Sequence, residues 1–214
     1  MMMNIMPAIA ALPEERVLLH NISWATYERL LEERTDAPGT RFIYDDGELE
    51  IMVVYIGHEE PNRTLAALAE ITALETGRDF SRAGGTTFKR QDLAKGFEPD
   101  SSFYFRHAKV VRGRYKTDLT ADPPPELVIE VDITRSSLNR FPIFAAIGVA
   151  EIWRYDGERV HFHSLEGKAY RPIEESLVLP PMTAAQATIF VERVRQETAA
   201  DWDRAVREWI RSRA

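Results

Sequence analysis

LVIEVDI, residues 127–133, is the most strongly β-like stretch of the chain. Apolar residues occupy both alternating sets of positions, which predicts a central strand covered on both faces of its sheet. Glu130 and Asp132 interrupt this apolar pattern. Because side chains two residues apart in a strand point the same way, both carboxylates are predicted on one face. Two charges in such a strand are costly unless something compensates them.

Two kinds of partner would compensate these carboxylates. A hard cation such as Mg²⁺ takes oxygen ligands from one or two carboxylates, and phosphodiester hydrolysis uses such an ion to polarise phosphate and activate water. Arginines on neighbouring strands would instead neutralise Glu130 and Asp132 without a metal. Another acidic pair, Glu98 and Asp100 on either side of Pro99, opens a further predicted strand. The pattern alone leaves both explanations open.

Helices and strands are predicted on both sides of this strand. Before it we expect a helix over 24–34 capped by Ser23, a hairpin over 41–54 turning at Asp46-Gly47, a helix over 59–76 and extended segments at 78–82, 86–90 and 101–105. After it we expect a helix over 141–147 capped by Ser136 or Ser137 and ended by Gly148, a strand meander over 151–173, and helices over 183–196 and 198–213. This order predicts a single α+β (mixed α/β) domain with a mixed sheet.

Composition narrows the class of protein. The 214 residues include no cysteine, which excludes disulfides, thiolate zinc sites and a cysteine nucleophile, and fits a reducing cytoplasm. No run of eighteen apolar residues occurs, so we expect no membrane span and a cytoplasmic location. The formal net charge of −7 argues against bulk polyanion binding, yet segment 78–116 holds ten Lys/Arg against four Asp/Glu. That segment is either a pair of ordinary solvated strands or a phosphate-facing rim.

Several motifs in order carry a resemblance to a known family. They are LEIMVVYIGHEEPNRTLAAL (49–68), GGTTFKRQDLAKGFEPDSSFYF (84–105) and DPPPELVIEVDITRSSLNRFPIFAAIGVAEIWRYDG (122–157). In these stretches the chain resembles the Uma-two family, whose members are restriction-endonuclease-like proteins of the PD-(D/E)XK nuclease superfamily. The resemblance implies a restriction-endonuclease-like core over 48–181, with residues 1–40 as an N-terminal helical extension and residues 183–214 as C-terminal helices.

The resemblance also implies a metal site. Asp100 would be the acid of the "PD" half-motif and Glu130 the acid of the second half-motif, and together they would hold Mg²⁺ or Mn²⁺. An acid on the first core helix often contributes in this superfamily, and Glu59 and Glu60, next to His58, are both candidates. The alternative for either is a first-turn acid that favours the helix dipole.

The chain departs from the superfamily pattern at its basic residue. The simple pattern places a lysine two positions after the second acid, where this chain has Asp132. Related sequences move that lysine to the following helix, where the matching position is Arg140, preceded by Asn139. Arginine can stabilise charge on a phosphate, but its high pKa excludes a role as general base. Lys89 is the nearest lysine that the site could recruit, and an ordinary surface lysine is the alternative.

Smaller signals concern histidines and tryptophans. His161 and His163 lie on one face of a predicted strand and are either metal ligands or ordinary surface residues. Trp202 and Trp209 form one apolar stripe on the last helix. That stripe would close the core or form the seam of a homodimer.

The leading hypothesis is a metal-dependent endonuclease acting on DNA, with Asp100 and Glu130 as metal ligands and Arg140 stabilising the transition state. A rival is a catalytically weakened member of the fold that binds nucleic acid or another protein. A third hypothesis treats the two carboxylates as the acid/base pair of a glycosidase-like hydrolase. In such enzymes the two carboxyl groups are separated by about 5 Å or by about 6.5–9.5 Å.

Overall fold

The structure is a computed structural model that describes residues 15–34, 39–53, 56–114, 116–133 and 138–213. Its helices are α1 Trp24–Glu33, α2 Ile56–Glu75, α3 Ala108–Val111, α4 Phe141–Ile147, α5 Ala184–Arg193, α6 Ala199–Arg211 and the 3₁₀ helix η1 Gln91–Leu93. Its strands are β1 Glu15–Leu19, β2 Thr40–Asp45, β3 Glu48–Val53, β4 Ser81–Arg82, β5 Phe88–Arg90, β6 Lys95–Phe97, β7 Ser101–Tyr104, β8 Leu127–Val131, β9 Glu151–Tyr155, β10 Val160–Glu166 and β11 Ala169–Ile173.

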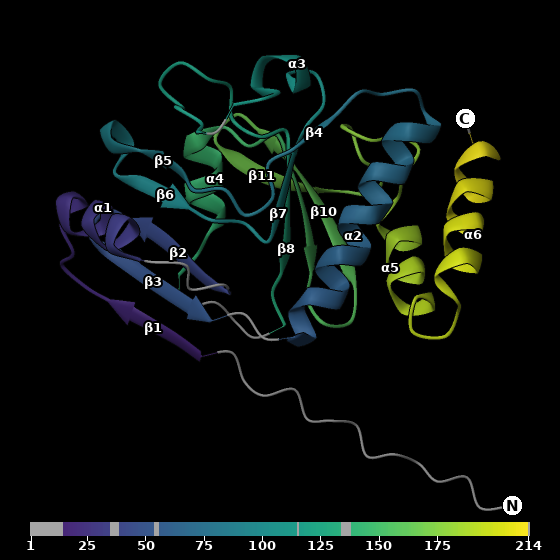
Figure 1. Ribbon diagram of the computed structural model, residues 1–214, viewed down its shortest axis with the longest axis horizontal. Helices are drawn as coiled ribbons and strands as arrows, with labels where there is room; N and C mark the ends of the chain where they lie inside the picture. Colours follow the sequence, from purple (N-terminus) through teal and green to yellow (C-terminus); the bar gives the residue numbers. More distant parts are fainter. Residues whose placement is uncertain (1–14, 35–38, 54–55, 115, 134–137, 214) are drawn as a thin grey trace, which may run out of the picture.

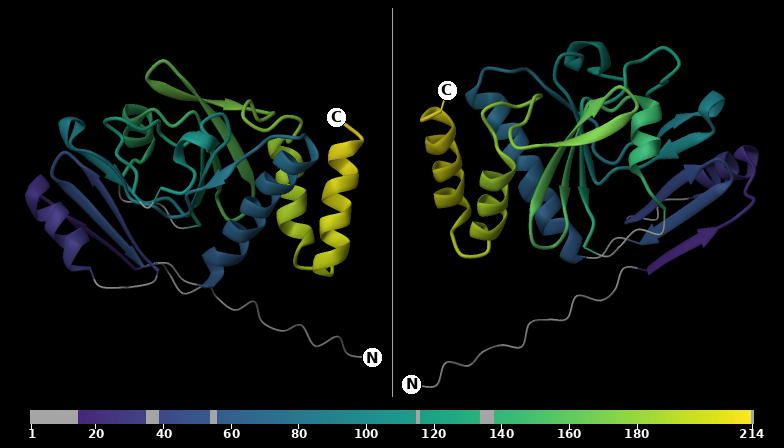
Figure 2. Two further views of the ribbon diagram at one scale, coloured as in Figure 1. Left: turned by 45° about the horizontal axis from the view of Figure 1, so that its top comes forward. Right: turned by 180° about the vertical axis from the view of Figure 1, so that it is seen from behind.

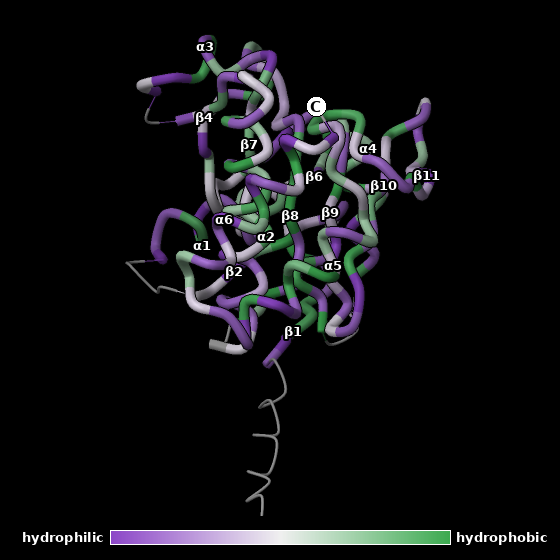
Figure 3. Tube along the Cα trace, turned by 90° about the vertical axis from the view of Figure 1, so that its right-hand side faces the viewer, coloured by the Kyte–Doolittle hydropathy of each residue, from purple (hydrophilic) through white to green (hydrophobic). Residues whose placement is uncertain are grey.

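The larger of two sheets has the strand order β11-β10-β9-β8-β7-β4. Strands β8 and β9 are parallel, and the other neighbours are antiparallel. Helix α4 lies in the connection between β8 and β9, as the crossover of a parallel pair requires. All five residues of β8 are buried, which confirms the predicted central strand. Hydrophobic segments gather around it in the middle of the molecule (Figure 3).

Two layers cover the larger sheet (Figures 1 and 2). Helices α2, α5 and α6 pack on one face, where they meet Ile129 and Trp153. On the other face, α4 and the smaller sheet meet Val128 and Ile152. We call this second face the α4 face. Since side chains alternate along a strand, Glu130 shares it with Val128. The mixed α+β fold expected from the sequence is therefore confirmed.

The smaller sheet has the order β1-β3-β2-β6-β5. Its β2–β3 hairpin turns at Asp46 and Gly47, which both have positive φ (45° and 94°), as a two-residue turn of this kind requires. Helix α1 begins at its predicted cap, where Ser23 Oγ accepts the Thr26 amide at 3.2 Å. The ring of Tyr27 then stacks on Tyr44 of β2, with centroids 4.7 Å apart.

The N-terminal region is more than the predicted helical extension. Strand β1 pairs along its whole length with β3 and so becomes an edge of the smaller sheet. Its five residues, ERVLL, begin with two charged residues and do not alternate between polar and apolar, which is why the sequence did not reveal the strand. Strand β6 was missed as well, because its three residues are too few to show an alternating pattern. The predicted Ser136 or Ser137 cap lies outside the described residues, and Arg140 occupies the N-cap position of α4.

The C-terminal helices close the core over α2. Trp202 is buried and its Nε1 donates to the Phe190 carbonyl at 2.9 Å. Trp209 packs edge-on against the Phe190 ring, with centroids 6.2 Å apart. The tryptophan stripe therefore serves the core of its own chain, which was one of the two roles expected for it. No helix in the described part of the chain is long and apolar enough to cross a membrane.

Candidate active site

Neighbouring strands bring Asp100 and Glu130 together. Asp100 directly precedes β7, and the antiparallel register of β7 and β8 places Ser101 opposite Ile129. Asp100 Oδ2 consequently accepts the backbone N–H of Val131 at 2.8 Å. Both acids are buried, with 7% of Asp100 and 3% of Glu130 exposed. The two half-motifs, thirty residues apart in the chain, therefore meet at one point of the sheet.

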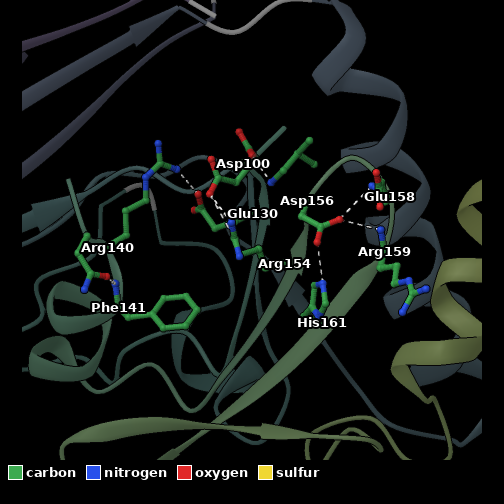
Figure 4. A network of polar contacts seen from close by, with 12 residues as sticks. Asp100, Glu130, Arg140, Phe141, Arg154, Asp156, Glu158, Arg159 and His161 are labelled. Carbon is green, nitrogen blue, oxygen red and sulfur yellow. Dashed lines mark hydrogen bonds and ion pairs between the residues drawn. The ribbon is translucent and has the colours of Figure 1, made fainter. Parts of the chain in front are cut away.

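Arg140 is the cation at this point. Pro142 falls in the first turn of α4, where its missing N–H costs nothing, so the helix can begin directly after Arg140. The guanidinium points back toward the sheet and donates through Nη1 to Glu130 Oε2 (Figure 4). Its Nη2 lies 3.2 Å from Oε1 of Glu50. Arg140 thus connects β8 of the larger sheet with β3 of the smaller one.

Glu50 is a member of the site that the sequence analysis missed. It lies in β3 with no exposed surface, and it accepts from Arg16 Nη1 at 3.2 Å and from the Leu138 amide at 3.2 Å. The signal was present, because Glu50 interrupts an apolar strand (ELEIMV) just as Glu130 interrupts LVIEV. An acid placed between apolar residues of a strand was informative in both cases.

Asp132 completes a network of alternating charges. Arg154 of β9 donates to Asp132 Oδ2 from Nη2 at 2.8 Å and from Nε at 3.2 Å, and Arg16 Nη2 reaches Oδ1 at 3.4 Å. Within the described residues the order is Arg154, Asp132, Arg16, Glu50, Arg140 and Glu130. Glu130 of β8 and Asp132 just after it are therefore neutralised by arginines, one of the two kinds of partner expected. Pairing with arginines does not by itself exclude the other expected partner, a metal ion.

Burial dominates the electrostatics of the two central acids. It raises the pKa of Glu130 to about 8; Arg140 opposes the shift, and the negative charge of Asp100 adds to it. Burial also raises the pKa of Asp100, against the lowering effects of the Val131 amide and of the charges on Arg140 and His58. Burial thus shifts both carboxyls toward their protonated forms, and added positive charge beside them would shift them back toward ionisation.

The pKa of Arg140 moves the other way. Burial alone would lower it, but the carboxylates of Glu130 and Glu50 raise it above the ordinary value for arginine. The guanidinium therefore stays charged, as expected, and does not accept a proton.

Helix α2 presents a histidine to this site. His58 is only 3% exposed, and a positive charge on it would lower the pKa of Asp100. The Glu59 side chain is 46% exposed and pairs with Arg63 one turn along α2, and Glu60, 56% exposed, pairs with Arg195. The structure does not bring either glutamate to Asp100 and Glu130. Among the described residues no group of three His, Cys, Asp or Glu side chains could hold a metal ion.

Lys89 and most cations of the basic segment considered from the sequence are already paired with acids. Lys89 Nζ pairs with Glu28 of α1 at 2.7 Å, on the outer edge strand of the smaller sheet. Six of the ten cations in segment 78–116 have acidic partners, namely Arg82, Lys89, Arg90, Lys95, Arg112 and Arg114. The segment thus offers fewer uncompensated cations than its composition predicts.

His161 and His163 have separate surroundings. His161 Nε2 lies 2.8 Å from Asp156 Oδ2. The His163 ring packs edge-on against Phe141 at 4.9 Å, and burial lowers its pKa. The histidine ring centroids are 6.5 Å apart. This arrangement gives no support to a shared metal ion.

The fold and the paired acids define a class. A mixed sheet carries one acid at the start of a strand and another inside the neighbouring strand, with helices on both faces; this is the arrangement of restriction-endonuclease-like proteins. Over residues 24–189 the sequence matches the family model Uma2, described as "Putative restriction endonuclease". Because the match covers more than three quarters of the chain, the protein belongs to the Uma2 family. A comparison with curated proteins gives no match.

Proposed function

We propose that this protein is a metal-dependent endonuclease that hydrolyses phosphodiester bonds in DNA. The observation that carries the proposal is the meeting of Asp100 and Glu130, two buried carboxyls on adjacent strands, in a chain of the Uma2 family. Family membership supports nuclease chemistry in general. The metal and the DNA substrate are parts of the proposal.

The donor set of the site fits a hard divalent cation. Asp100 and Glu130 offer carboxylate oxygens, and their raised pKa values reflect a need for positive charge nearby. Mg²⁺ is usually bound in proteins by one or two carboxylates and keeps several waters, so two protein ligands suffice. When bound, such an ion polarises a phosphate and lowers the pKa of a coordinated water.

Arg140 supplies positive charge to the site and positions Glu130. Arg140 keeps Glu130 in place and, because it stays protonated, can stabilise negative charge on a phosphate. It is not a proton acceptor. The five lysines of the chain are at positions 89, 95, 109, 116 and 168, so none stands at the usual position of the family lysine. We therefore expect slow cleavage by the natural sequence.

Nicking of supercoiled plasmid in Mg²⁺ and in Mn²⁺ tests the proposal. Cleavage is expected to require metal, to disappear in Asp100→Ala and in Glu130→Ala, and to persist in Glu166→Ala, which removes an exposed acid at the end of β10. Arg140→Lys is expected to cleave faster, because a positioned proton-transfer group contributes roughly 10²–10⁴-fold. Cleavage that survives in both alanine variants would overturn the assignment of the site.

A binding module without catalysis is the second candidate. It is favoured by one observation, the engagement of both Arg140 Nη atoms by Glu130 and Glu50. If neither the natural protein nor Arg140→Lys cleaves plasmid at high protein concentration in either metal, the binding module would be favoured.

A homodimer is a further proposal, because duplex cleavage addresses two strands. Light scattering of the purified protein would test it.

A further inference from the structure

A row of side chains leads across the α4 face from the candidate active site toward solvent. The parallel register of β8 and β9 places Arg154 beside Glu130, and the antiparallel register of β9 and β10 places His161 beside Arg154. Residues opposite each other on neighbouring strands share a face of the sheet. Exposure rises along the row, because Glu130 is 3% exposed whereas the side chains of Arg154 and His161 are 34% and 43% exposed.

Each basic member of the row is held by an acid. Arg154 is bound by Asp132 through Nε and Nη2, which fixes the plane of its guanidinium. His161 is bound by Asp156, whose other oxygen accepts the backbone amides of Glu158 and Arg159 at 2.9 and 2.8 Å (Figure 4). Side chains fixed in this way lose little conformational freedom when a ligand binds.

The row retains a donor for a ligand. Among the described residues, no hydrogen bond engages Nη1 of Arg154, and Nδ1 of His161, which can donate only when the ring is protonated, is also unengaged. A guanidinium with one side occupied and its Nη1 NH₂ group unused suits a phosphate oxygen. Six of the ten cations of segment 78–116 are already paired with acids among the described residues, which leaves Arg154 as a further cation beside Glu130.

We propose that Arg154 and His161 bind the phosphodiester backbone of a nucleic-acid duplex next to the Asp100–Glu130 pair, with Arg154 as the principal contact. This assignment rests on the proposed function for the identity of the ligand. The two residues are positioning residues, because they hold the backbone while the buried acids face the bond that is cut.

Salt-dependent binding measures this directly. Fluorescence anisotropy of a labelled duplex of about 20 base pairs would be followed in EDTA, so that binding is separated from cleavage, at several KCl concentrations. For Arg154→Gln we expect about tenfold weaker binding and a plot of log K against log salt that is shallower by about 0.9, the loss of one phosphate contact. His161→Gln should show a smaller change in the same direction.

Arg159→Gln is the matched control. It makes the same change of charge five residues along the chain, on an exposed side chain that points away from Arg154 toward α5 (Figure 4). Its salt slope should equal that of the natural protein. Arg154→Lys should keep the slope, since a lysine still neutralises a phosphate. A general loss of structure in Arg154→Gln would appear as a lower Tm in all salts and would not change the slope selectively.

Two results would overturn the inference: equal salt slopes for Arg154→Gln and Arg159→Gln, or no salt-dependent duplex binding by the natural protein. Failure here is distinguishable from failure of the nuclease proposal. Plasmid cleavage that needs Asp100 and Glu130 but does not change in Arg154 variants would refute only the assignment of Arg154 and His161 as phosphate contacts. Duplex binding that depends on Arg154, in a protein that cleaves no DNA, would refute only the proposed nuclease activity.

Discussion

Arg140 Nη2 lies 3.2 Å from Glu50 Oε1, so a residue at the start of α4 binds an acid from a strand of the smaller sheet. The same guanidinium binds Glu130 of the larger sheet. The side chains of Arg140, Glu50 and Glu130 are 8%, 0% and 5% exposed. One cation therefore both compensates an acid of the candidate active site and joins the two sheets.

Loss of this guanidinium should destabilise the fold. Arg140→Met leaves Glu50 and Glu130 with less compensation in a buried place, and removal of one partner from a buried ion pair costs roughly 3–5 kcal/mol. We expect a loss near the lower limit, about 3 kcal/mol, because Arg16 still binds Glu50. Urea denaturation monitored by tryptophan fluorescence would measure it.

Arg63→Met provides the control for that measurement. Its ion pair with Glu59 joins side chains that are 77% and 46% exposed, so its removal should change stability by less than about 0.5 kcal/mol. Addition of Glu50→Gln to Arg140→Met should recover part of the loss. A cost below about 1 kcal/mol for Arg140→Met would show that the buried bridge contributes little.

Local patterns predicted those parts of the fold that local interactions determine. The turn at Asp46-Gly47, the cap at Ser23 and the buried strand β8 each depend on residues within a few positions of one another. The acids of the site were also recognisable, because an ionisable residue inside an apolar strand is unusual wherever it occurs.

The partners of those acids were not predictable in the same way. Arg140 and Glu50 are 90 residues apart, and Arg16 and Asp132 are 116 apart. Which of the many arginines reaches which acid depends on how the two sheets pack, and no periodicity in the sequence encodes that. The contribution of a glutamate from α2 depends on packing in a related way. Rotation of the helix about its axis decides whether His58 or Glu59 faces Asp100.

Gly96 allows α1 to lie close to the smaller sheet. A Cβ at this position would meet the hydroxyl of Tyr27 and lie 3.0 Å from its Cε1 and Cζ atoms. Tyr27 has no exposed surface and stacks on Tyr44, so its ring has nowhere to move. Gly96→Ala should therefore cost roughly 1–3 kcal/mol through overpacking.

The control is Gly57→Ala near the start of α2, where a Cβ would meet nothing within 4 Å. Alanine in a helix is favoured over glycine by up to about 1 kcal/mol. Thermal unfolding of the two variants should therefore shift Tm in opposite directions. Equal Tm values would contradict the close approach of α1 to β6.

Metal binding should be visible in stability as well as in activity. The pKa of Glu130 in the fold, about 8, is above its ordinary value of 4.5, so the folded state holds a proton that the unfolded chain releases between these values. The stability contributed by that proton is complete below the lower value and is lost as pH rises through the higher one. A cation at Asp100 and Glu130 replaces the proton, so millimolar Mg²⁺ should raise Tm more at about pH 9 than at about pH 6.

Glu130→Gln should remove both the pH-dependent component and the Mg²⁺ effect, while Glu166→Gln should retain them. Differential scanning fluorimetry with and without Mg²⁺ would compare the three proteins. A Tm shift of equal size at both pH values, or one that survives in Glu130→Gln, would place the cation elsewhere on the protein.

Asp156 shows the opposite linkage between pH and stability. Burial acts to raise its pKa, but the amides of Arg159 and Glu158 and the His161 ring outweigh burial and lower the pKa to about 2. A carboxyl with a lowered pKa contributes stability above its ordinary value of 3.8, and that contribution is lost as pH falls toward the folded value. In Asp156→Asn both amides keep an acceptor, whereas the charge and the oxygen that faces His161 are removed. After allowance for solvent screening we expect a loss on the order of 1 kcal/mol at neutral pH. Acid titration of stability should then be flatter for Asp156→Asn than for the natural protein between about pH 4 and about pH 2. Identical curves would mean that Asp156 does not hold His161 through its charge, and the bracing of the row would then depend on Asp132 alone.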